Sequence, residues 1–64
     1  MEIGTRVNHK EFGNGTIIRI LYEGTRRETF AIEFDVSNSK LHNCLGLTES
    51  NKGYFCSSKE LEVI

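Results

Sequence analysis

The sequence has few cysteines, no long apolar run and no excess of one charge. Only two of its 64 residues are cysteines, Cys44 and Cys56, which argues against a disulfide-dense secreted domain. No apolar run approaches the length of a membrane span, and no signal-peptide core follows Met1. We therefore expect one small, complete cytoplasmic domain with a thin margin of stability and no contact with a membrane.

The charge of the chain is close to balanced. Its eight Lys and Arg residues and nine Asp and Glu residues give a net charge of -1, whereas dedicated nucleic-acid binders usually carry a marked basic excess. The distribution is uneven, because residues 1–27 carry a net +2 and residues 28–64 a net -3. A local basic patch is therefore still compatible with the sequence.

Apolar and polar residues alternate with a period of two along most of the chain, which indicates β-strands. We expect strands over residues 3–8, 16–23, 29–35, 53–56 and 61–64. In the third strand, Phe30, Ile32 and Phe34 are expected to face a core, and Ala31 and the acidic residues to face water. In the second strand, Ile18, Ile20 and Tyr22 lie on one face and Ile17, Arg19 and Leu21 on the other, so we expect it to be central and strongly bent.

Turn residues separate these strands. Gly13-Asn14-Gly15 predicts a tight turn, and Gly24 to Arg27 a polar hairpin tip. Residues 37–53 form a loop too long to be structureless in a compact domain, so its leucines (Leu41, Leu45 and Leu47) should pin it or it should carry function. Ser57 and Glu60 stand at capping-box spacing and predict one helical turn before the last strand.

The segment GTRVNHKEFGNGTI, residues 4–17, resembles the opening of Tudor-like and KOW-like SH3 barrels. It is similar to the pattern G-D-x-V-x-H-x-x-F-G-x-G-x-V that begins the C-terminal domain of bacterial superfamily 1A DNA helicases, and Phe30 to Asp35 matches the strand that follows. Phe34-Asp35, His42 to Cys44, Gly53 to Cys56 and Leu61-Glu62 resemble small phage-encoded SH3-like proteins. The resemblance implies a small five-stranded SH3-like barrel, and the helicase domain implies RNA polymerase or nucleic acid as a partner.

The cysteines and histidines leave three interpretations open. His42, Cys44 and Cys56, with His9 as a fourth residue, are weak candidates for zinc ligands, since no Cys-x-x-Cys knuckle is present. Cys44 and Cys56 are also far enough apart in sequence to form a disulfide across the loop. Two reduced, packed thiols are the favoured interpretation, because free cysteine is commonly a small buried hydrophobe. We expect no cofactor.

Catalysis is not expected. A thiol paired with His42 or His9 is the one candidate for a nucleophile and its base, and no third residue orients such a pair. A barrel of this size also offers little pocket volume. Gly13-Asn14-Gly15 is not followed by a Lys-Ser/Thr pair and a helix, so a phosphate-binding loop is not expected either.

The remaining chemistry predicts a binding surface. We expect a protein-interaction module of a phage or mobile element that docks on a host protein. Its contact surface would combine the hairpin from Gly24 to Glu28 with the loop from Lys40 to Lys52. Aromatic residues beside charged residues are typical of binding hot spots, and the candidates are Phe12, Tyr22, Arg26, Arg27, His42, Tyr54 and Phe55. The alternative is a nucleic-acid-binding module that uses a basic face of Lys10, Arg19, Arg26 and Arg27.

Overall fold

A computed structural model describes all residues, 1–64, and shows an all-β chain. Five antiparallel strands form one sheet in the order β4-β3-β2-β1-β5. Their bounds are Arg6–His9 (β1), Gly13–Leu21 (β2), Thr29–Phe34 (β3), Gly53–Cys56 (β4) and Leu61–Val63 (β5). Two short 3₁₀ turns complete the chain, Cys44–Gly46 (η1) and Ser58–Glu60 (η2). No helix is long and apolar enough to cross a membrane.

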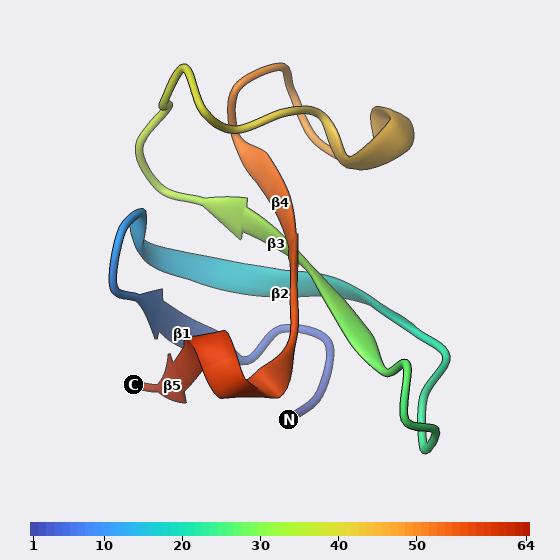
Figure 1. The fold of residues 1–64 in the computed structure, drawn as a ribbon. Helices are drawn as coiled ribbons and strands as arrows, with labels where there is room; N and C mark the ends of the chain where they lie inside the picture. The colour runs from blue at the N-terminus through green and yellow to red at the C-terminus, as the bar shows by residue number, and fades with distance from the viewer.

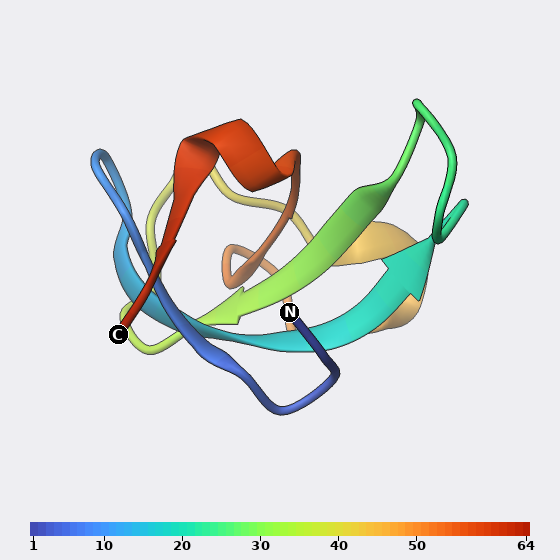
Figure 2. The ribbon, with the colours of Figure 1, turned by 90° about the horizontal axis from the view of Figure 1, so that it is seen from below.

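The sheet is strongly curved, as Figure 2 shows, and its concave side holds a small core. The sheet order leaves β4 and β5 as its two edges, and η2 carries the chain from one edge to the other (Figure 1). The sheet is thus curved, and no backbone ladder joins β4 to β5. The core cluster consists of Val7, Ile17, Phe30, Ile32, Phe34, Leu41, Cys56 and Leu61.

The expected helical turn before the last strand is present. The Glu60 carboxylate accepts a hydrogen bond from the backbone N–H of Ser57 at 3.3 Å, and the Glu60 N–H donates to the Ser57 carbonyl at 3.1 Å. These bonds satisfy backbone groups that the short helix would otherwise leave free. The turn delivers Leu61 to β1, where it pairs with His9.

The first strand lies further along the chain than predicted, and the turn after it lies earlier. Ile3 and Gly4 form a turn instead of a strand, closed by the bond from the Thr5 N–H to the Glu2 carbonyl at 3.0 Å. The chain then reverses at residues 10–12, and Gly13 to Gly15 already belong to β2. The prediction of a Gly13–Gly15 turn was therefore wrong.

The reason lies in the different demands on Gly13 and Gly15. Gly13 has φ +83 and open space where a Cβ would lie, so this position favours glycine because its backbone is left-handed. Gly15 is buried, and a Cβ there would lie 2.7 Å from Ile32 Cγ2 and 2.9 Å from the Glu33 carbonyl oxygen. Position 15 thus favours glycine because β2 and β3 approach too closely there for a Cβ. The sequence pattern does not separate these two uses of glycine.

A β-bulge bends the second strand, in agreement with the expected bend. The register between β2 and β3 shifts between Ile17 and Arg19, so the extra residue Ile18 breaks the period of two. As a result Ile17 is fully buried and Ile20 also packs on the core, although the simple alternation placed them on opposite faces. That assignment of faces was wrong beyond the bulge.

The third strand follows its prediction except at Ala31. Phe30, Ile32 and Phe34 are buried in the core cluster. Ala31 was expected to face water but has an exposed fraction of 0 %. Its cross-strand neighbours are Arg19 and Phe55, and side chains that are paired across strands share a face of the sheet. Ala31 is therefore the small residue between two large ones on the outer face.

Candidate functional site

A row of rings runs along one rim of the sheet. The ring centroids of Phe12 and Tyr54 are 5.2 Å apart, those of Tyr54 and His42 are 5.4 Å apart, and those of His42 and Phe55 are 5.5 Å apart. Tyr54 and Phe55 are neighbours in β4 and point to opposite faces, so the His42 ring lies across the strand edge and contacts both. Four of the predicted partner-binding residues are thus brought together.

Backbone hydrogen bonds attach His42 to the edge of β4. The His42 N–H donates to the Gly53 carbonyl at 2.9 Å, and the Gly53 N–H donates to the His42 carbonyl at 2.7 Å. His42 Nδ1 accepts a further bond from the Cys44 N–H at 2.9 Å. The ring therefore holds the first residue of η1 in place while it contacts the aromatic row.

The loop around η1 is anchored at two points and exposed directly after the second. Leu41 is part of the core cluster, which confirms that a leucine pins this loop. Cys44 is fully buried, and its Sγ would lie 2.7 Å from a Cβ at Gly53, so the thiol packs closely against β4. Leu45, next along the chain, has an exposed fraction of 91 %, and Leu47 has one of 40 %.

Three consecutive residues of this loop adopt left-handed backbone conformations. Their φ values are 49° for Cys44, 57° for Leu45 and 96° for Gly46. For residues with a Cβ this region costs about 1–2 kcal/mol each, and such strain persists only where the surroundings enforce it. Here the bonds from the Gly46 and Thr48 N–H groups to the Asn43 carbonyl, both 3.0 Å, hold the loop. The strained segment displays the side chain of Leu45 to solvent.

The hairpin between β2 and β3 forms a second exposed region. Tyr22, Arg26 and Arg27 are all exposed, and Tyr22 has an exposed fraction of 64 % with φ 53°. The Glu28 carboxylate accepts a bond from the Gly24 N–H at 3.1 Å, which ties the two sides of the hairpin together. Figure 1 shows this hairpin and η1 on the same side of the molecule but well apart.

The predicted basic face is divided by the structure. Lys10 lies in the turn before β2, whereas Arg26 and Arg27 lie beyond its other end. A strand of this length spans roughly 30 Å, so Lys10 and the hairpin do not form one patch. Arg19 lies nearer the hairpin end and is exposed. The chain forms two ion pairs, Arg6–Asp35 and Lys40–Glu11, so the three arginines of the hairpin side have no acidic partner.

The cysteines do not form the predicted ligand group. Both are free and buried. Cys56 lies with His9 and Glu60, whose ligand atoms are all within 4.8 Å of one another, and this group includes neither His42 nor Cys44. Burial raises the pKa of the Cys44 thiol. Burial, followed by the negative charge of Glu60, raises the pKa of Cys56 to about 12.

The hydrogen bonds of the two histidines disfavour metal binding. Nδ1 of His9 accepts from the N–H groups of Glu11 at 3.0 Å and Phe12 at 3.4 Å, just as Nδ1 of His42 accepts from Cys44. A backbone N–H always carries its hydrogen, so each Nδ1 must present its lone pair and the proton of the neutral ring lies on Nε2. A ring that binds zinc through Nε2 needs its proton on Nδ1.

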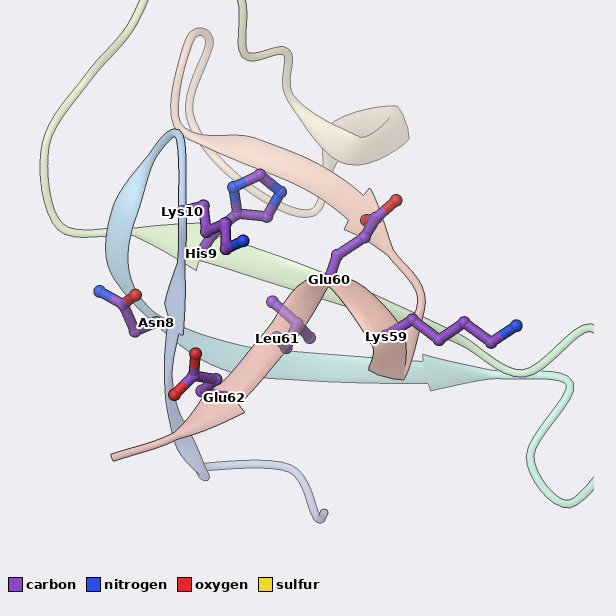
Figure 3. Close-up of a pocket in the computed structure, with 7 residues that line it drawn as sticks. All are labelled: Asn8, His9, Lys10, Lys59, Glu60, Leu61 and Glu62. Carbon is purple, nitrogen blue, oxygen red and sulfur yellow. The ribbon is translucent and has the colours of Figure 1, made fainter.

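A cavity of about 230 Å³ lies beside the His9 ring. Figure 3 shows its lining residues, which come from the end of β1 and the turn after it, from η2 and from β5. The Glu60 carboxylate lies on the side toward which one His9 ring nitrogen points. Two lysines and two glutamates line it, and Leu61 is its one apolar residue. Ligand pockets are usually larger and mainly apolar, so this cavity is a weak candidate for a small-molecule site.

The exposure of Leu45, 91 %, was not predicted from the sequence. The three leucines of the loop were all expected to pin it, and one of them, Leu41, has that role. Which of the leucines is exposed depends on the left-handed backbone at Cys44 and Leu45. Gly46 after Leu45 was the one local indication of such a turn.

Comparison of the chain with protein-family models, with curated proteins and with solved structures finds no match.

Proposed function

We propose that this chain is a small SH3-like module that binds a protein partner through the η1 loop and the aromatic row beside it. The strand order and the 3₁₀ turn before the last strand are those of an SH3-like barrel, which supports the resemblance noted in the sequence. A fold of this kind specifies no partner by itself. The proposal therefore depends on the loop.

The observation that carries the proposal is the exposure of Leu45. Leu45 has an exposed fraction of 91 % on a strained backbone that hydrogen bonds and the buried Cys44 hold in place. Neither the exposed side chain nor the strain stabilises the isolated chain. A loop that is already ordered loses little further entropy when a partner binds it, which favours affinity. Leu45 then inserts into an apolar pocket of the partner, and the aromatic row supplies the surrounding contacts.

Replacement of Leu45 by Asn tests this proposal. Asn tolerates the left-handed conformation well, and Leu45 contributes little burial, so the melting temperature should stay the same or rise. Loss of an anchoring side chain costs roughly 2 kcal/mol of binding, or about thirtyfold in affinity. The matched control is Val63→Asn, which changes another exposed apolar residue, with an exposed fraction of 61 %, on the edge strand β5.

The assay compares the proteins retained by the parent chain and by each variant from a lysate, with and without nuclease treatment. Identified proteins that the parent and the Val63→Asn chain retain, and that the Leu45→Asn chain loses, support the proposal. The same recovery by all three chains would show that Leu45 anchors nothing. Recovery that disappears on nuclease treatment would instead indicate nucleic acid as the bound species.

A further inference from the structure

The outer face of the sheet connects the two exposed regions. Arg19, Ala31 and Phe55 are paired in register across β2, β3 and β4, and the His42 ring lies 5.5 Å from that of Phe55. We call these four residues the outer strip. Because the small Ala31 is fully buried between two larger neighbours, the surface of the strip is depressed at its centre.

The strip is apolar near η1 and basic near the hairpin. The half-buried side chains that pack on the core are Phe12, Ile20 and Tyr54, so Phe55 is directed away from it. Beyond Phe55 and His42 lies the loop that displays Leu45. At the other end Arg19 is exposed. The hairpin that carries Arg26 and Arg27 lies on the same side of the molecule as η1 in both views (Figures 1 and 2).

The basic end of the strip is suited to bind carboxylates that are spaced apart on a partner. All three basic residues are arginines, whose planar guanidinium groups bind carboxylates through two parallel hydrogen bonds. None of them has an ion-pair partner in the chain, even though Glu23 and Glu28 lie in the same hairpin. These glutamates repel the dense charge of a nucleic-acid backbone more than they repel a partner with a few spaced carboxylates.

From this distribution we propose that the outer strip binds an extended or helical segment of a partner protein that is acidic at one end and apolar at the other. The acidic end pairs with Arg19, Arg26 and Arg27, and the apolar end packs on Phe55 and Leu45. The inference rests on the proposed function, since it names the chemistry of the partner for the same surface. It adds a direction, because charge determines which end of the segment lies at the hairpin.

The test is a nuclear magnetic resonance titration of the full chain labelled with ¹⁵N. One probe is a synthetic peptide with Asp and Glu in one half and Leu and Phe in the other. The second probe carries Lys in place of every acidic residue, and the third is a single-stranded oligothymidylate. We expect the acidic peptide to shift the amide signals of Arg19, Ala31, Phe55 and the hairpin, and to bind about tenfold more tightly than the lysine peptide.

Charge-reversal variants complete the test. Arg26→Glu together with Arg27→Glu should remove the preference for the acidic peptide, whereas the control Lys59→Glu, an exposed residue of η2, should leave it unchanged. Equal binding of both peptides at η1, without hairpin shifts, overturns the inference and leaves the proposed function standing. Absence of peptide shifts on the strip, or hairpin shifts with oligothymidylate alone, also overturns it. Loss of the proposed function is detected separately by the Leu45→Asn comparison.

Discussion

Replacement of Gly15 by Ala should be far more costly than replacement of Gly13, although both glycines stand in the same Gly-Asn-Gly segment. A Cβ at Gly15 would lie 2.7 Å from Ile32 Cγ2, 2.9 Å from the Glu33 carbonyl oxygen and 3.1 Å from Phe34 Cδ1. The Glu33 oxygen is backbone and moves only with β3. Overpacking of this kind costs about 1–3 kcal/mol, and contact with backbone places Gly15→Ala in the upper half of that range.

That cost is large for a chain of 64 residues. At 0.05–0.15 kcal/mol per residue the total stability is about 3–10 kcal/mol, so Gly15→Ala removes a substantial part of it. With a shift of about 4–8 °C per kcal/mol for a small domain, the melting temperature should fall by roughly 10–20 °C. Thermal and urea unfolding followed by circular dichroism measure both quantities.

Gly13 provides the matched control. It has φ +83 and nothing within 4 Å of an added Cβ, so Gly13→Ala should cost about 1 kcal/mol for the left-handed conformation alone. A D-alanine at position 13, introduced by chemical synthesis, should be neutral or stabilise the fold by roughly 0.5 kcal/mol. If Gly15→Ala cost no more than Gly13→Ala, the close approach of β2 and β3 would not be the reason for glycine at position 15.

Three further predictions concern single side chains. Because the pKa of Cys56 is raised to about 12, its neutral thiol stabilises the fold fully below the ordinary value of 9.0, and this stabilisation is lost as the pH rises from there toward 12. Cys56→Val should therefore flatten the alkaline decline of stability in urea titrations, and an unchanged slope would contradict the assignment. The Arg6 guanidinium donates hydrogen bonds to the Asp35 carboxylate at 2.8 and 2.5 Å and lowers the pKa of that carboxyl. The pair thus stabilises the fold above pH 3.8, and this stabilisation is lost as the pH falls below that value. Asp35→Asn should therefore reduce the loss of stability in acid. An equal loss of stability with pH in both proteins would show that the exposed pair contributes nothing. His42→Asn keeps an acceptor for the Cys44 N–H, whereas His42→Ala leaves it unpaired, so the Ala variant should be less stable than the Asn variant by about 1 kcal/mol, and amide hydrogen exchange at Cys44 should distinguish them.

The parts of the fold that were predictable depend on local pattern. The alternation of Phe30, Ile32 and Phe34 identifies β3 and its core face, because one buried face imposes a period of two. Ser57 and Glu60 identify η2, since a capping box needs only residues three positions apart. The short β4 also follows from its apolar residues after a glycine. In each case the cause and the structure lie within a few residues of each other.

The parts that were not predictable depend on contacts between distant segments. The burial of Ala31 is decided by Arg19 and Phe55, its neighbours on two other strands. The aromatic row had been predicted as single binding residues, but its geometry depends on the bridge between His42 and Gly53. The exposure of Leu45 likewise depends on where Cys44 is buried. No sequence window contains these pairings, so a single sequence does not determine them.

The neighbouring positions of β1 and β5 have a consequence for the order of events in folding. Val7 pairs with Val63, so the first and last strands must meet across almost the whole chain. Strands β2, β3 and β4 pair between sequence neighbours and can form early, whereas closure of so long a loop carries the largest entropic cost and should come late. Until β5 joins β1, one edge of β1 has no partner. The five-stranded sheet is therefore complete only when this most distant pairing has formed.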